Sequence, residues 1–197
     1  NNIINDNHVL TININTVITL SISSLNILDL TGIEDFASLN SLYCDNNQIT
    51  TLDLSQNTNL TILDCYENQL TTLDVSGNGG LTNLNCRYNQ LDNIDISNNT
   101  YLTYLDCSTN NIDNLNTTNN PELIYLYCRD NQLTNLNTSF NPNLLRLFCD
   151  ENQITQLDVT NNLNLTQIEC YSNQLTTLDL RENDSLTSLW CYSNQLT

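Results

Sequence analysis

Cysteine is the residue type whose placement in this sequence bears most directly on chemistry. The 197-residue chain has 8 cysteines and a formal net charge of −18. In an acidic chain without lysine, cysteines are typical of a disulfide framework, and groups of four thiolates bind zinc. Here they recur at a constant interval of 21 residues, at Cys44, Cys65, Cys86, Cys107, Cys128, Cys149, Cys170 and Cys191. A constant interval indicates an internal repeat, so the cysteines must be interpreted through that repeat.

Catalysis by acid–base or nucleophilic chemistry has little support. The single histidine, His8, precedes the repeats, and lysine is absent. A nucleophile, a base and an orienting group therefore cannot be assembled around a histidine. Carboxylates on adjacent repeats, such as Asp130 and Glu151, are the kind of pair that cleaves glycosides, but an open sheet offers no pocket to desolvate them. We predict that the protein is not an enzyme and uses no cofactor.

The repeating unit has the pattern L-x-x-L-x-C-x-x-N-Q-L-T-x-L-D-L-S-x-N-x-x, with position 1 at Leu39. Seven complete units extend to residue 185, and a partial eighth covers residues 186–197. Upstream, residues 17–38 fit the pattern loosely as a degenerate first coil. We predict a single domain, with an N-terminal cap and degenerate coil at residues 1–38 and the repeat array at residues 39–197.

Each unit contains the same nine-residue frame twice, and both frames have apolar residues two positions apart. This is the period of a strand with one buried face, and no stretch has helical periodicity. We predict a mostly β solenoid with little or no helix. The first frames form a parallel sheet on the concave face, and the second frames form short strands on the opposite face. With two strands per coil, adjacent coils have a similar spacing on both faces, which predicts modest curvature.

Asparagine closes the two frames, at positions 9 and 19. Asparagine tolerates turn conformations, and its amide bonds backbone groups that are left unpaired where a chain bends. We therefore predict amide ladders at both corners of the stack, in preference to a ligand-binding role. The excess of asparagine (38 residues) and leucine (35 residues) in the chain is then the repeat itself, its corners and its core.

This pattern resembles the leucine-rich repeat family, and in particular the 21-residue cysteine-containing repeats of internalin J-like bacterial secreted and surface proteins. The resemblance covers residues 39–197, and the sequence LDLTGIEDF at residues 28–36 is similar to the entry segment of such arrays. It implies a right-handed solenoid with a parallel sheet, and a secreted or bacterial cell-surface location. It also implies a role in recognition or adhesion, without catalysis.

In such a stack the cysteines occupy position 6 and face inward. Equivalent residues of adjacent coils lie about 4.8 Å apart, which is within the Cα range of a disulfide. Parallel side chains in register nevertheless have the wrong geometry for that bond. Free thiols packed as small apolar groups are favoured. Disulfides and metal ligation are the lesser alternatives, since zinc needs its sulfurs around one point.

Aromatic residues gather at the positions that face outward from the first sheet. Positions 3, 5, 7 and 8 carry ten of the 13 aromatic residues and three of the four arginines. Exposed tyrosine, tryptophan and arginine are the usual anchors of protein interfaces, and such rings also stack on sugars. The alternative is that the rings only stabilise the sheet by pairing across strands. The predicted ligand-binding surface consists of Tyr43, Tyr66, Tyr88, Tyr104, Tyr125, Tyr127, Arg129, Arg146, Phe148, Tyr171, Trp190 and Tyr192.

Aspartate recurs at position 15 on the opposite side, at Asp53, Asp74 and Asp95 among others. Stacked carboxylates repel each other unless cations bridge them, so a weak calcium site is a minor alternative there. A solvated face that keeps the protein soluble is the favoured interpretation. We otherwise predict no metal site.

Together these features predict a noncatalytic recognition or adhesion module of a secreted or cell-surface bacterial protein. It would bind a protein or carbohydrate ligand at a surface through the aromatic-rich concave sheet. The alternative is a structural spacer or stalk that projects other domains. An acidic surface disfavours nucleic acid, and no apolar run reaches the roughly 18 residues needed for membrane insertion. The array stops in mid-repeat, which predicts continuation of the chain or self-association through an uncapped C-terminal coil.

Overall fold

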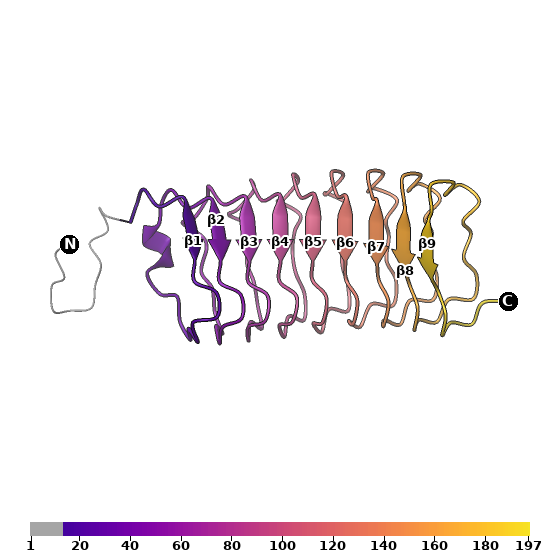
Figure 1. The fold of residues 1–197 in the computed structure, drawn as a ribbon, viewed down its shortest axis with the longest axis horizontal. Helices are drawn as coiled ribbons and strands as arrows, with labels where there is room; N and C mark the ends of the chain where they lie inside the picture. The colour runs from indigo at the N-terminus through magenta and orange to yellow at the C-terminus, as the bar shows by residue number, and fades with distance from the viewer. Residues whose placement is uncertain (1–13) are drawn as a thin grey trace.

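The structure, a computed structural model, describes residues 14–197 and forms a solenoid with one parallel sheet (Figure 1). The predicted cap residues 1–13, including His8, lie outside the described residues. Within the described part the nine strands follow chain order across the sheet, and the helical content is the single 3-10 helix η2 (Ile33–Asp35). The strands are β1 (Thr19–Ser21), β2 (Ser41–Tyr43), β3 (Ile62–Asp64), β4 (Asn83–Asn85), β5 (Tyr104–Asp106), β6 (Tyr125–Tyr127), β7 (Arg146–Phe148), β8 (Gln167–Glu169) and β9 (Ser188–Trp190). The predicted β solenoid with almost no helix is confirmed.

The register of the strands follows the repeat. Leu42 pairs with Leu63, and Leu63 with Leu84, so equivalent positions of successive coils lie side by side. The first step is one residue longer, because Leu20 of β1 pairs with Leu42. From β2 to β8 the central residue of each strand points into the core and its neighbours point out, since side chains alternate along a strand. Every outward position therefore forms a continuous line of side chains along the sheet.

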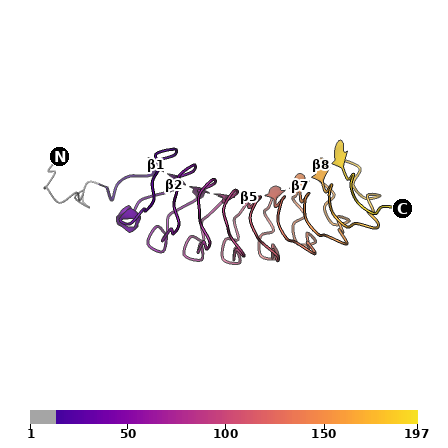
Figure 2. The same ribbon diagram turned by 90° about the horizontal axis from the view of Figure 1, so that it is seen from below.

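The predicted second strands do not form. All strands in residues 14–197 belong to the one sheet, which lines the inner side of a shallow arc (Figure 2). The outer edge of an arc is longer than its inner edge, so the coils are further apart there and cannot make a continuous ladder. Isolated hydrogen bonds still join the coils, for example from Gln69 N to the Ile49 carbonyl at 2.9 Å. The curvature is modest, as predicted, although the coils lack the second strands from which it was predicted.

The asparagines at position 9 form the predicted amide ladder. The amide of Asn68 donates to the carbonyls of Cys44 and Cys65 at 3.0 and 3.1 Å, and so joins two adjacent coils. Its Oδ1 accepts the N–H of Ile49 in the preceding coil at 3.0 Å. Each such side chain therefore satisfies backbone groups that the bend after the strand leaves unpaired.

The asparagines at position 19 form the second ladder, with a difference that the repeat pattern conceals. Asn78 donates to two carbonyls of the preceding coil at 3.2 and 2.9 Å. Thr117 and Thr138, buried at position 16, donate hydroxyl hydrogens to Oδ1 of Asn141 and Asn162, both at 2.8 Å. Elsewhere position 16 is aliphatic, and the buried Oδ1 has no hydrogen-bond partner, as in Asn57, Asn78, Asn99, Asn120 and Asn183.

The residue at position 8 adopts the left-handed conformation in every coil. Tyr88 has φ 51° and Thr109 has φ 52°, and the same holds for the equivalent residues from Ser24 to Ser193. This conformation is strained for side chains other than glycine and asparagine, and most strained for β-branched residues. The corner after the strand therefore imposes a backbone conformation on residues that are not glycine.

We expect Thr109→Asn to stabilise the fold. Asparagine tolerates a φ of 52°, so relief of the strain on threonine should add about 1 kcal/mol and raise the melting temperature by about 2–4 °C. Thermal unfolding followed by circular dichroism measures the change. The reverse substitution at the equivalent corner, Asn46→Thr, should lower the melting temperature. Equal stability of Thr109→Asn and the parent would contradict the argument from strain.

Candidate binding surface on the concave face

The densest part of the predicted surface is a chain of aromatic rings on β5, β6 and β7. Tyr104 meets Tyr127 edge to face with centroids 5.6 Å apart, and Tyr127 stacks on Phe148 at 4.6 Å. Tyr125 lies 6.3 Å from Tyr104 and 6.4 Å from Tyr127. The rings come together because positions 3 and 5 of adjacent strands are in register. Four residues predicted from three separate repeats therefore form one continuous apolar patch.

A second aromatic group lies at the C-terminal end of the same face. Tyr171 stacks on Tyr192 at 4.7 Å with nearly parallel planes, and lies 6.4 Å from Trp190. Trp190 and Tyr192 are exposed, with half or more of each side chain accessible. Tyr43, on β2, is half-buried near the N-terminal end of the face. The twelve predicted residues thus share one face. Seven of their rings fall into these two groups, and Tyr43, Tyr66 and Tyr88 belong to neither.

The arginines of this face lie against aromatic rings. Arg146 is 5.8 Å from the Tyr125 centroid, and Arg129 is 4.9 Å from that of Phe148. Arg87, which was not among the predicted site residues, lies between the rings of Tyr66 and Tyr88 at 4.8 and 5.4 Å. A guanidinium over an aromatic face is favourable and holds the long side chain in place.

Buried carboxylates on this face are functional candidates that the repeat pattern did not reveal. Asp150 and Glu169 flank Arg129, whose Nη2 lies 3.3 Å from Glu169 Oε2 and whose Nε lies 3.9 Å from Asp150 Oδ1. Burial raises the pKa of Asp106 and Asp150, and Arg129 offsets part of both shifts. The sequence signal for them is a carboxylate at position 5 or 7 in a repeat that also carries or adjoins an arginine.

The concave face contains a hollow of about 280 Å³ at β4, β5, β6 and β7. This corrects the expectation that an open sheet has no pocket. The hollow exists because Ser108 and Thr109 are small, whereas the equivalent positions in the neighbouring coils carry arginine and larger side chains. The lining residues are Arg87, Tyr88, Tyr104, Asp106, Ser108, Thr109, Tyr127, Arg129 and Phe148. We refer to it as the concave hollow.

Several solved structures are similar to this fold. An internalin (InlF) from Listeria monocytogenes strain 4b F2365 is 26% identical over 87% of this chain and 52% of its own, with a TM-score of 0.80. The fold is a leucine-rich repeat solenoid. The ectodomain of the Arabidopsis thaliana receptor kinase GASSHO1/SCHENGEN3, in complex with CASPARIAN STRIP INTEGRITY FACTOR 2, is 26% identical over 85% of this chain and 23% of its own, with a TM-score of 0.76.

The functional domain of InlJ from Listeria monocytogenes, which includes a cysteine ladder, is 32% identical over 91% of this chain and 54% of its own, with a TM-score of 0.47. This leucine-rich repeat chain therefore spans about half the length of the two Listeria chains. The resemblance to bacterial internalin-type leucine-rich repeat proteins is confirmed among its structural neighbours. No protein-family model matches the chain, and no curated protein sequence does.

The cysteines of the leucine-rich repeats form a ladder of free thiols in the core. Seven are fully buried, and Cys191 in the last coil is partly buried. Burial raises the pKa of the Cys44 and Cys170 thiols to about 12. Protonated, buried thiols are unreactive and pack as small apolar groups, as the repeat spacing predicted.

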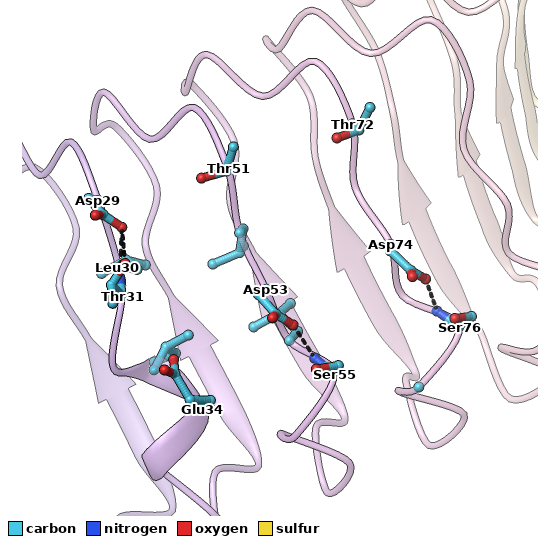
Figure 3. A pocket seen from close by; sticks show the side chains of 14 residues that line it. Asp29, Leu30, Thr31, Glu34, Thr51, Asp53, Ser55, Thr72, Asp74 and Ser76 are labelled. Carbon is cyan, nitrogen blue, oxygen red and sulfur yellow. Dashed lines mark hydrogen bonds between the residues drawn. The ribbon is translucent and has the colours of Figure 1, made fainter.

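The position-15 aspartates lie on the convex side, and Asp53 and Asp74 line a groove of about 490 Å³ between the first coils (Figure 3). Oδ1 of Asp53 accepts the N–H of Ser55 at 3.0 Å, and Asp74 and Asp95 make the same bond to the serine two residues on. Among residues 14–197 no group of three or more His, Cys, Asp or Glu is placed to hold a metal ion. Each of these carboxylates is oriented by its own turn, and the calcium alternative stays a prediction.

The other carboxylates considered for chemistry do not form a site. Asp130 and Glu151 both adopt the left-handed position-8 conformation and are exposed. No helix in the described part of the chain is long and apolar enough to cross a membrane.

Stability should depend on the protonation of Asp64, on the concave face. Burial raises its pKa to about 6, the Asp45 carboxylate adds to the shift, and Arg87 offsets part of it. The unfolded value is about 3.9, so the folded state binds more protons between these pH values and stability falls as the pH rises through this window. We expect Asp64→Asn to raise the melting temperature at pH 7.5 and to have little effect at pH 4.

Asp74→Asn provides a matched control, for which the change in melting temperature at pH 7.5 should have the opposite sign. Hydrogen bonds from Ser76 lower its pKa, so its charged form stabilises the fold above the unfolded pKa. Asp74→Asn should therefore lower the melting temperature at pH 7.5. A rise at pH 7.5 for Asp74→Asn, or a fall for Asp64→Asn, would contradict these assignments.

Proposed function

We propose that this domain is a noncatalytic recognition or adhesion module that binds a protein or carbohydrate ligand through its concave face. The supporting observation is the distribution of aromatic side chains. Ten of the 13 lie on the concave columns, and nine of these ten contact another ring or one of three arginines. Elsewhere the exposed large aromatics are Tyr101 and Phe140. A stalk has no need of this asymmetry, so recognition is favoured over a spacer role.

The structural neighbours support an interaction role in a general way. They are leucine-rich repeat proteins and indicate no enzymatic family, and the Arabidopsis ectodomain was solved in complex with CASPARIAN STRIP INTEGRITY FACTOR 2. We further propose that the protein acts outside the cell or at the bacterial surface, where free thiols buried as deeply as these resist oxidation. Self-association through the C-terminal coil stays a prediction.

The experiment first identifies the ligand and then locates its contact. Immobilised domain is used to capture surface proteins, and a glycan array is screened in parallel. Hydroxyl-radical footprinting is then carried out on the domain, free and with each purified ligand bound. We expect protection of Tyr125 and Tyr127, with Tyr101 oxidised as in the free protein. Protection of Tyr101 or Phe140 in place of the concave residues would overturn the proposal. Absence of any ligand in both screens would favour the spacer.

A further inference from the structure

The concave hollow presents hydrogen-bonding groups that the fold leaves unused. Nε of Arg87 is buried without a hydrogen-bond partner, and so is the hydroxyl of Ser108. Within the described residues Arg87 makes no ion pair, in contrast to Arg129, which pairs with Glu169 and Asp150. A buried donor without a partner costs free energy, typically about 1–3 kcal/mol, and such groups point to a missing partner.

The charges in the hollow alternate in sign. Asp106, which lines the hollow, is 5% exposed and accepts the N–H of Ser108 at 3.1 Å. Both Arg87 and Arg129 act on its carboxyl electrostatically from neighbouring coils, one on each side. A guanidinium, a carboxylate and a second guanidinium therefore follow one another along the sheet. Donors and acceptors are both available within one small volume.

One wall of the hollow is aromatic. Tyr104 and Tyr127 meet edge to face at 84°, and Phe148 stacks on Tyr127. Arg129 packs over Phe148, and its ion pair with Glu169 holds it there. The wall is therefore fixed by contacts within the protein before any ligand arrives, which reduces the entropic cost of binding.

The electrostatics distinguish between classes of ligand. A cationic group would meet the guanidinium groups of Arg87 and Arg129 directly. An anionic group would meet Asp106 directly, with Asp64 beyond Arg87, and Asp150 and Glu169 beside Arg129. A neutral polyhydroxyl ring adds no charge, accepts from the guanidinium groups, donates to the carboxylate and offers an apolar face to the aromatic wall.

We propose that the concave hollow is a subsite for one ring of a neutral saccharide. This deepens the proposed recognition function and rests on it. The volume of about 280 Å³ lies just below the range of about 300–1,000 Å³ for small-molecule sites, which suits a single ring with the rest of the glycan lying along the aromatic face. Arg87 and Asp106 supply the specific hydrogen bonds, and Tyr104, Tyr127 and Phe148 supply the apolar contact.

The test uses the whole 197-residue chain on an array of neutral oligosaccharides with glucose, galactose, mannose or N-acetylhexosamine ends, and of acidic oligosaccharides. We expect binding to one or more neutral glycans, confirmed by calorimetric titration. Arg87→Gln and Asp106→Asn should each weaken it by about tenfold or more, because a charged hydrogen-bond partner is lost. Arg181→Gln, at an exposed arginine outside the concave columns, should leave it unchanged.

Three outcomes would overturn the saccharide site: a silent array, binding confined to acidic glycans, or affinity unchanged in both hollow variants. Arg87→Gln changes a side chain that is only partly buried, and it decides the matter if Asp106→Asn, which alters a buried group, fails to fold. If a protein ligand is captured and footprinted on the concave face while the array stays silent, the recognition role stands and the saccharide subsite does not. If no ligand contacts the concave face, both fail.

Discussion

Replacing Tyr125, Tyr127 and Phe148 together by serine should weaken ligand binding by about 100-fold or more. Aromatic anchors at the centre of an interface commonly contribute about 2 kcal/mol or more each, and 1.4 kcal/mol is a factor of ten. The three rings form part of one patch, with Tyr127 stacked on Phe148 at 4.6 Å. Their removal therefore takes away both the direct contacts and the support that each ring gives the next.

The matched control is the double substitution Tyr101→Ser and Phe140→Ser. These side chains are 65% and 51% exposed and lie outside the concave columns, so binding should be unchanged. Titration calorimetry and thermal unfolding are measured on all variants. If the rings only stabilise the sheet by cross-strand pairing, the triple variant will melt at a lower temperature but bind with parental affinity when folded. That result would contradict the binding role.

Asn131→Ala should destabilise the fold by about 3 kcal/mol or more, which corresponds to about 6–12 °C in melting temperature. The Asn131 amide accepts the N–H of Ile112 at 3.0 Å and donates to the carbonyls of Cys107, Cys128 and Arg129 at 3.1–3.2 Å. Alanine leaves these groups unpaired, and about 1–3 kcal/mol is lost for each one that water cannot reach. Because each coil contacts only its neighbours, the defect should also reduce the cooperativity of unfolding.

Asn194→Ala tests the same argument at the end of the array. Asn194 makes the equivalent bonds, including one from the N–H of Leu175 at 3.0 Å, but it is only partly buried. Water can replace its amide, so the loss of stability should be much smaller. Chemical denaturation with circular dichroism gives both values. Equal losses at the two positions would show that burial of the ladder is not what makes the amide important.

Most of the fold could be predicted because the period determines which positions coincide. Once the repeat is known, the leucines, the cysteines and the asparagines fall into inward or corner columns, as in the ladder through Asn131. The prediction of strands on the convex face was wrong. A two-residue apolar period shows which side of a segment is buried, but not whether neighbouring coils are close enough to pair.

The candidate site could be predicted only in outline. The aromatic columns follow from register, since Tyr127 and Phe148 must be adjacent on β6 and β7. The concave hollow depends on differences between neighbouring repeats, such as small Ser108 between Arg87 and Arg129. The buried state of Asp106 and Asp150 likewise depends on which side chains cover them. A consensus pattern averages out these differences, so it cannot show them.

The regular register also bears on how such a protein can change over generations. From β2 onward each strand is related to the next by the same 21-residue step, and each coil presents its outward residues independently of the core. Duplication or loss of one repeat by unequal recombination therefore inserts or removes a whole strand without frustrating the hydrogen bonds of its neighbours. The recognition face can therefore be lengthened or shortened by whole strands. Exchange of a large outward residue for a small one, such as Ser108, opens a hollow between neighbouring coils, and the reverse exchange closes it.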